Sequence, residues 1–258
     1  MNKRGQVTVF VILGIVVVAL IVLLLAFRKE IIPTSATTEN LNGIMDDIRD
    51  HISDCIKESA EGPLERIALQ GGYLSVPAGS YRLWNDNTVS FLCYNQQNTE
   101  RCMNRLLTRE KMEEELSESV KQELASCIDV QSFSSGIIKT FEVVLSQPMK
   151  LTISIMKDQV VFNLNYPVTL KSKSSDNVVT EKEFSVPVEV PLGELYEVAL
   201  DILDAETSIG RFDTLTYMLA KMSRYTLYLH KPYPDKIYQI QMRDGDYIFQ
   251  FAVEGEPS

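Results

Sequence analysis

One uninterrupted hydrophobic run near the N-terminus constrains this chain more than any other feature. Residues 7–27 carry no charged side chain, and Thr8 and Gly14 are the only breaks in the apolar series VTVFVILGIVVVALIVLLLAF. At 1.5 Å per residue, a helix of this length spans about 31 Å, which matches the hydrocarbon thickness of a bilayer. The run exceeds the ~7–15 apolar residues of a cleavable signal peptide, and no A-x-A-like site follows it. We therefore expect residues 7–27 to form a retained transmembrane helix with the lipid bilayer as its partner.

The charges around this helix differ from those of the rest of the chain. Lys3 and Arg4 precede it, Arg28 and Lys29 follow it, and Glu30 tips the balance towards a cytoplasmic N-terminus. Without these four basic residues the body holds 21 Lys and Arg against 35 Asp and Glu, a net charge of about −14. A body this acidic repels phosphate backbones, so no nucleic-acid partner is expected.

The cysteines indicate the compartment. Cys55, Cys93, Cys102 and Cys127 all follow the hydrophobic run. An even set beyond a membrane anchor is typical of disulfides in an oxidising compartment, so we expect a single-pass protein of the cell membrane with an extracytoplasmic body. Three pairings are possible. We favour Cys93–Cys102, which is local, with Cys55–Cys127, because these two end amphipathic helices and precede isoleucine. Four unpaired thiols in a cytosolic domain are the alternative.

Residues 1–6 form a short basic leader, MNKRGQ. Its Lys-Arg-Gly-Gln sequence, followed at once by an apolar helix, resembles the class III signal of archaeal pilins and archaellins. This resemblance implies cleavage by a membrane peptidase between Gly5 and Gln6, which would leave the helix on the mature subunit. Phe10 occupies the fifth mature position, where a bacterial-type pilin carries Glu. A plain signal anchor with basic flanks is the alternative.

Beyond a spacer at residues 28–38, residues 39–130 are predicted to form a helical subdomain with short strands and disulfides. Apolar residues at 3/4 spacing predict a helix from Thr38 to about Ala60, ended by Gly62-Pro63 and followed by a short helix over residues 64–70. Short strands are expected at YLSV (73–76), YRLW (81–84) and TVSFLCY (88–94). A second long helix is expected over residues 107–128, with Thr108 as its N-cap.

The segment 131–258 is predicted to be an antiparallel sheet with inserted helices. Alternating and β-branched residues predict a meander over residues 137–145, 150–156, 159–169 and 178–190. Helices are expected after Pro191 and over residues 214–222, and strands over residues 225–230, 237–242 and 247–253. An Asp-Gly turn separates the last two strands. The fold class is therefore α+β, with an N-terminal transmembrane helix and disulfide bridges.

Five segments, in this order along most of the chain, together resemble uncharacterised single-pass surface proteins of small-genome (DPANN-type) archaea. They are RGQVTVF, CIKESAEGPLERIALQGGYLSVP, EEELSESVKQELASCID, DQVVFNLNYPVTL and VPLGELYEVALDIL. The resemblance implies a single-pass protein with its bulk outside the cell and no assigned biochemical activity.

Candidate chemistry is sparse. Asp47, His51 and Asp54 can share one helix face and hold a metal, but a solvated acidic helix face with one histidine on it is the simpler explanation, and we favour it. Ser154 to Lys157 and Ser175-Asp176-Asn177 echo motifs of serine penicillin-binding enzymes, yet the first falls in a predicted strand and the Lys-Thr-Gly element is missing. We assign no catalytic, metal or cofactor site.

These observations predict a membrane-anchored structural or interaction protein of the cell envelope, working in surface contact or envelope organisation. Its partners would be other envelope proteins, or further copies of the chain through residues 7–27. One alternative is a type IV pilin-like filament subunit. Another is an anchored enzyme that acts on envelope polymer.

Overall fold

The computed structural model describes residues 16–18, 38–95, 101–128, 141–145 and 148–255. They form a mixed α+β fold with two sheets and two disulfides, which confirms the predicted class for the body of the chain. Gly5, Gln6 and the hydrophobic run apart from residues 16–18 lie outside this set. Within the described ranges, no helix is both long enough and apolar enough to cross a membrane.

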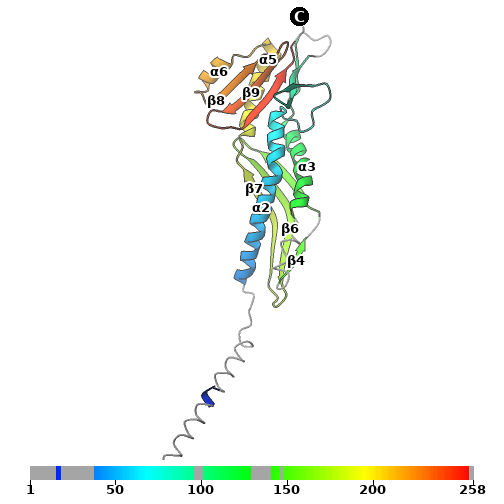
Figure 1. Cartoon of the computed structure of the whole chain (residues 1–258), viewed down its shortest axis with the longest axis vertical. Helices are drawn as coiled ribbons and strands as arrows, with labels where there is room; N and C mark the ends of the chain where they lie inside the picture. The colour runs from blue at the N-terminus through cyan, green and yellow to red at the C-terminus, as the bar shows by residue number, and fades with distance from the viewer. Residues whose placement is uncertain (1–15, 19–37, 96–100, 129–140, 146–147, 256–258) are drawn as a thin grey trace, which may run out of the picture.

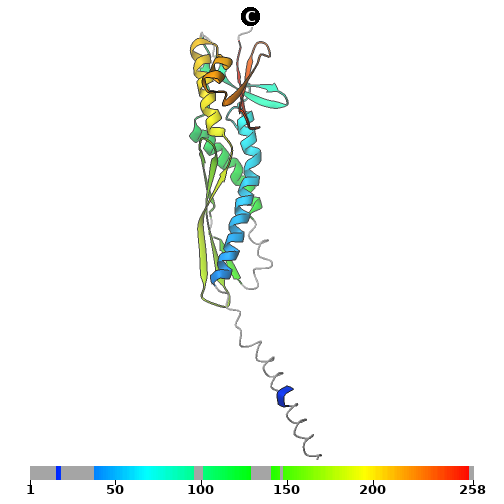
Figure 2. The ribbon, with the colours of Figure 1, turned by 90° about the vertical axis from the view of Figure 1, so that its left-hand side faces the viewer.

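The body is elongated, and helix α2 (Thr38–Leu69) runs along most of its length (Figures 1 and 2). The N-terminal end of α2 lies at the lower end of the body in Figure 1, beside a long sheet. Its C-terminal end reaches a second sheet at the upper end of the body. One helix therefore connects both halves of the molecule.

The long sheet is built around β6 (Val160–Ser172). One edge of β6 pairs with β7 (Val178–Val188), and the other pairs with β4 (Phe141–Leu145) and β5 (Lys150–Ile155), which lie end to end. All pairings are antiparallel. The predicted four-strand meander is therefore wrong in its order, because β4 and β5 occupy one edge and do not pair with each other. Pro148 lies between them and lacks the N–H that a continuous ladder needs.

The upper sheet combines strands from residues 81–104 with strands from residues 225–253, in the order β1-β2-β10-β9-β8, with β3 also paired to β2. Its strands are β1 (Tyr81–Trp84), β2 (Asn87–Tyr94), β3 (Met103–Asn104), β8 (Tyr225–His230), β9 (Lys236–Met242) and β10 (Ile248–Val253). Strand β10 pairs with β2 in parallel, while the other pairings are antiparallel. The predicted segments 39–130 and 131–258 thus contribute to the same sheet.

The predicted helix break at Gly62-Pro63 is wrong. Helix α2 continues to Leu69 with Pro63 inside it. Proline in a helix interior removes one hydrogen bond and costs about 3 kcal/mol. The buried stripe keeps its phase across this point, from Ile56 and Ala60 to Leu64 and Ile67. Burial of both halves against one core offsets the local cost, so tertiary packing overrides the sequence signal.

Helix α3 (Arg109–Cys127) is confirmed, and the Thr108 side chain accepts a hydrogen bond from Lys111 N as its N-cap. The helix also protects the free edge of β5. A carboxylate oxygen of Glu113 accepts the Ile155 N–H at 2.7 Å, and the Ser117 hydroxyl donates to the Leu151 carbonyl at 2.9 Å.

Residues 73–76, which were predicted to form a strand, form an irregular turn instead. Two hydrogen bonds to distant residues hold this segment. The Leu74 N–H donates to Glu115 Oε2 at 2.9 Å, and the Tyr73 hydroxyl donates to the Arg105 carbonyl at 2.5 Å. The Glu115 carboxylate thus replaces a strand partner for the Leu74 N–H.

Both predicted disulfides are confirmed. Cys55–Cys127 joins the middle of α2 to the last residue of α3 across 72 residues, with Cα atoms 5.7 Å apart. Closing a loop of that length stabilises the fold by about 4 kcal/mol in the chain-entropy account. Cys93–Cys102 joins β2 to the residue before β3, with Cα atoms 5.1 Å apart.

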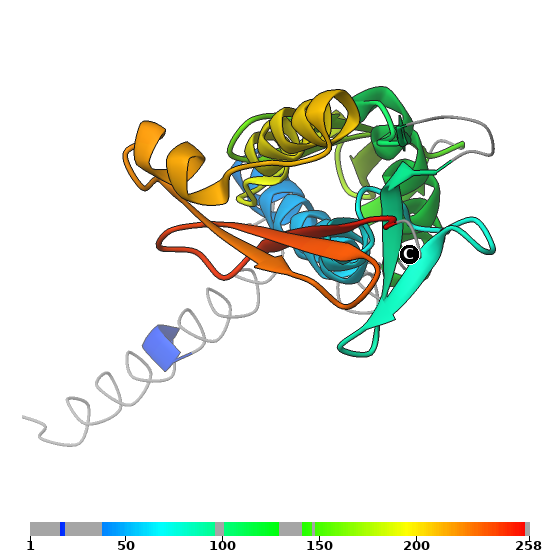
Figure 3. The same ribbon diagram turned by 90° about the horizontal axis from the view of Figure 1, so that it is seen from above.

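Helix α5 (Leu192–Ile209) and the short α6 (Thr214–Ala220) complete the upper half. Seen from above, α5 and α6 lie along one side of strands β8 to β10 (Figure 3). The buried residues of α5 include Leu195, Val198, Ala199, Ile202 and Leu203, the face that the sequence predicts.

Candidate functional site

A groove of about 940 Å³ lies where the two halves of the body meet. Three separate segments form it: the C-terminal half of α2, the end of β7 with the residues that follow it, and the turn into β10. Its lining comprises Lys57, Glu58, Glu61, Leu64, Glu65, Leu69, Pro187, Val188, Glu189, Val190, Asp246, Tyr247 and Ile248. We call this the acidic groove.

The floor of the acidic groove is apolar and fixed in place. Leu64, Val188, Val190 and Ile248 line it, and Tyr247 donates its hydroxyl hydrogen to the Leu64 carbonyl at 2.7 Å. Burial, helped by the nearby Glu65 charge, raises the pKa of Tyr247 well above its usual range. The phenol therefore stays protonated at physiological pH, and its hydrogen bond holds the β9–β10 turn against α2.

Almost all of the charged side chains on the rim of the groove are acidic. Glu58, Glu61 and Glu65 recur at spacings of three and four residues on α2 and so lie along one face, while Glu189 and Asp246 approach from the other segments. These five carboxylates are solvent-exposed, and Lys57 is the single basic residue in the lining. A concave surface lined by one sign of charge concentrates counter-charged ligands. The groove is therefore suited to a cationic segment that also carries apolar side chains.

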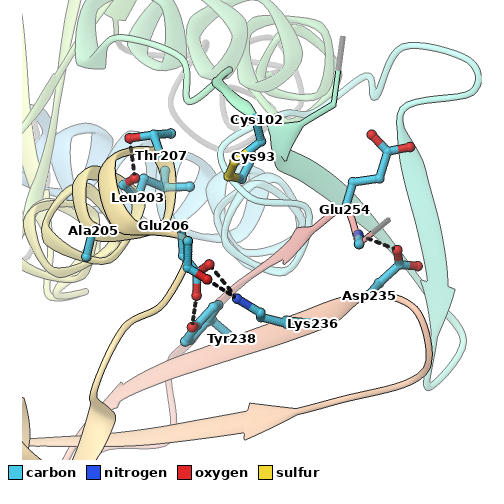
Figure 4. Close-up of polar contacts among 12 residues, drawn as sticks. Cys93, Cys102, Leu203, Ala205, Glu206, Thr207, Asp235, Lys236, Tyr238 and Glu254 are labelled. Atoms are coloured by element: carbon cyan, nitrogen blue, oxygen red, sulfur yellow. Dashed lines mark hydrogen bonds and ion pairs between the residues drawn. A yellow bond between two sulfur atoms is a disulfide. The ribbon is translucent and has the colours of Figure 1, made fainter. Parts of the chain in front are cut away.

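Outside the groove, two buried glutamates fix α5 to the upper sheet. Glu206 is 3% exposed and points from α5 towards β9 (Figure 4). One of its carboxylate oxygens accepts the Tyr238 hydroxyl, and the other accepts Lys236 Nζ at 2.5 Å. Lys236 also donates to the Gly210 carbonyl at 2.9 Å. This cluster fixes the C-terminal end of α5 to the sheet that carries the β9–β10 turn.

Glu194 repeats the arrangement at the other end of α5. It is also 3% exposed, accepts the Tyr225 hydroxyl at 2.6 Å, and pairs with the Arg224 guanidinium at 2.7 Å. Both glutamates thus combine a tyrosine with a cation, which compensates for burying their charge. Sequence reasoning missed them. The available signal was their helical phase, because Glu206 falls on the same face as Ala199 and Ile202.

The residues predicted as chemical candidates do not come together. His51 Nε2 lies 3.7 Å from Cys55 Sγ, a disulfide sulfur, while Asp47 and Asp54 are exposed. Across the described part of the chain, no group of three or more His, Cys, Asp and Glu side chains is arranged to hold a metal.

The two echoes of penicillin-binding motifs are also separated. Ser154 lies in β5, and Lys157 lies in the turn that leads into the start of β6. Ser175-Asp176-Asn177 lies beyond the other end of β6, where the Asn177 carbonyl accepts the Ser172 N–H at 3.0 Å. Because β6 has 13 residues, the two sequences lie at opposite ends of the long sheet.

Comparisons with known proteins add no family to this description. No family model matches the sequence, and no curated protein or solved structure is similar enough to count as a match.

Proposed function

We propose that this chain is a single-pass, membrane-anchored structural and interaction protein of the cell envelope. Its body would stand outside the cytoplasm, and the acidic groove would bind a cationic segment of a partner. The apolar run at residues 7–27 supports the anchor, and α2 starts only ten residues after that run ends. Two disulfides support an oxidising compartment for the body.

The acidic groove is the observation that carries the interaction role. Its volume of about 940 Å³ is at the upper end of the range of ligand-binding clefts. Apolar side chains line its floor, so the burial of a ligand's apolar atoms there is favourable. Five carboxylates on its rim attract positively charged groups of a ligand.

Placement in the membrane is tested by protease treatment of intact cells, with membrane fractionation alongside. An extracytoplasmic body is digested from outside and leaves a short membrane-bound remnant. Protection of the body from protease in intact cells, with digestion after lysis, would overturn the proposed location.

Binding is tested with the full chain in detergent and a fluorescent octapeptide of alternating Lys and Val. We expect the double substitution Glu61→Lys with Glu65→Lys to weaken binding by about tenfold or more, because it reverses two rim charges. The matched control is Asp47→Lys with Asp54→Lys, which makes the same charge change on exposed residues of the same helix outside the groove. Equal losses in the two variants would show that net charge, not the groove, determines binding.

A pilin-like filament subunit is the second candidate. It is favoured by the basic leader directly before the apolar run and by the long helix α2, which packs along an antiparallel sheet. N-terminal sequencing of the mature protein decides this candidate. A start at Gln6 supports it, and a start at Met1 excludes it.

A further inference from the structure

The long sheet has one protected edge and one open edge. Helix α3 covers the β5 edge, where Glu113 and Ser117 form hydrogen bonds with the strand backbone. At the other edge, β7 runs alongside α2 (Figure 1), and β6 is its only partner among the described strands. A strand at the edge of a sheet presents a row of N–H and C=O groups to which a further strand can pair.

The register of the long sheet identifies which residues of β7 face this open edge. The Leu151 carbonyl of β5 points to α3, away from β6. Bonded and non-bonded pairs alternate in antiparallel strands, so Leu164, which lies opposite Leu151, directs its backbone groups to Phe184 of β7. Because successive residues of a strand point their backbone groups to opposite sides, Glu183 and Ser185 face the open edge.

Pro187 independently supports this assignment. It belongs to the same alternate set as Ser185, and a proline within a sheet is tolerated where its nitrogen faces away from the neighbouring strand. The open edge therefore offers the N–H and carbonyl of Ser185 and the carbonyl of Pro187. Both residues are exposed, so these groups can be reached from outside.

The open edge of β7 leads into the acidic groove. Pro187 lines the groove, as do residues 188–190 directly after it. Glu58, Glu61 and Glu65 line the groove from α2. A strand added to β7 would therefore have its backbone along Ser185 and Pro187 and its side chains near these three carboxylates.

The charges of the groove determine which strand is favoured. Five carboxylates and one lysine line it, so a basic strand is attracted, and the apolar floor favours apolar side chains between the basic ones. A second copy of β7 does not have this composition, because its sequence VVTEKEFSVPV contains two glutamates and one lysine. Charge complementarity thus selects a basic segment of another protein.

We propose that the partner binds the acidic groove as an extended basic strand that adds to the open edge of β7. This inference rests on the proposed function of the groove and names the conformation of the bound segment. The backbone groups of Ser185 and Pro187 bond to the added strand, and the groove carboxylates bind its basic side chains. In this mode of recognition, main-chain hydrogen bonds provide affinity and side-chain contacts provide specificity.

Residue-resolved hydrogen–deuterium exchange of the full chain in detergent tests the proposal, with and without a saturating amount of the alternating Lys–Val octapeptide. The Glu183 and Ser185 amides should exchange about tenfold more slowly when the peptide is bound, because they gain hydrogen-bond partners. The Phe184 and Val186 amides face β6 and serve as internal controls, with changes below about twofold. Equal slowing of all four amides, or no slowing of any, would overturn strand addition.

A matched peptide tests the other side of the same hydrogen bonds. N-methylation of all eight residues of the Lys–Val peptide keeps its charge and side chains but removes every main-chain donor. This peptide should bind at least about tenfold more weakly than the parent peptide, because it cannot donate to the carbonyls of β7. Unchanged affinity would show that side chains alone hold the peptide, which would overturn the proposal.

Failure of strand addition can be distinguished from failure of the groove. If the parent peptide binds and the Glu61→Lys, Glu65→Lys variant weakens it, but the β7 amides do not respond alternately, the groove binds a cationic segment in another conformation. Only the strand inference is then lost. If the parent peptide does not bind, the proposed role of the groove and the added strand are both overturned.

Discussion

Among single side chains, the buried Glu206 is one of two carboxylates that fix α5 to the upper sheet. Its carboxylate accepts both the Tyr238 hydroxyl and Lys236 Nζ, and the Lys236 side chain is 29% exposed. Glu206→Gln leaves the lysine without a counter-charge at a largely buried position. We expect the free energy of unfolding to fall by about 2 kcal/mol, less than for a fully buried pair because water reaches the lysine. Chemical denaturation of the full chain in detergent, with disulfides intact, measures this change.

Glu197→Gln on the same helix is the control for this substitution. Glu197 pairs with Arg109 at 2.7 Å, but its side chain is 56% exposed. An exposed pair contributes about 1 kcal/mol or less, so this variant should be nearly as stable as the parent protein. Equal losses for the two variants would show that burial of Glu206 is not what makes its ion pair important.

The tyrosines bonded to carboxylates predict how stability depends on alkaline pH. Burial, followed by the hydrogen bond to Glu194, raises the pKa of Tyr225 from its usual value of 10.0 to about 12. Between these values the unfolded chain loses this proton while the folded chain retains it, so stability falls as pH rises. Tyr225→Phe should lower stability at pH 8 but weaken the decline between pH 10 and 12. Thermal melts across this range test the expectation, and parallel curves for the two proteins would contradict it.

Two glycines show how helices depend on their surroundings. Gly43 lies inside α2, where an added Cβ meets no atom within 4 Å. Gly43→Ala should therefore stabilise the fold by about 0.5–1 kcal/mol through helix propensity. Gly193 lies in the first turn of α5, where a Cβ would be 2.2 Å from the Met156 carbonyl oxygen. Gly193→Ala should destabilise the fold, because the close approach of α5 to the β5–β6 turn cannot be kept. Melting temperatures that shift in the same direction would contradict this account.

Most helices and strands of the described chain were predictable because their patterns are local. Thr108 capping, the Asp-Gly turn and the alternation of β6 are each determined by neighbouring residues. The exceptions involve distant partners. Pro63 stays helical because its flanks share one core, and residues 73–76 turn because Glu115 and Arg105 supply hydrogen-bond partners.

The acidic groove was not predictable for the same reason. Its residues come from 57–69, 187–190 and 246–248, and no sequence pattern connects these segments. Their approach depends on α2 crossing both sheets and on β10 pairing with β2. The cysteine pairing was predicted correctly, although part of the argument was wrong: Cys93 is close to Cys102 in sequence, and Cys127 ends α3, but Cys55 lies in the middle of α2.

Over its full length the described body should unfold as one unit, although its two sheets are separate. Helix α2 packs against β7 in the long sheet and β10 in the upper sheet, and β2 and β10 join distant parts of the chain.

Trp84, the only tryptophan, lies in β1 with its ring centroid 5.2 Å from that of His230, so its fluorescence reports on the upper sheet. Among the described residues, helical circular dichroism reports mainly on α2, α3 and α5. We expect the two signals to give the same urea midpoint, as a two-state transition requires. A fluorescence transition at clearly lower urea would show that the upper sheet unfolds first. In that case the groove, whose walls come from both halves, would open before the rest of the molecule.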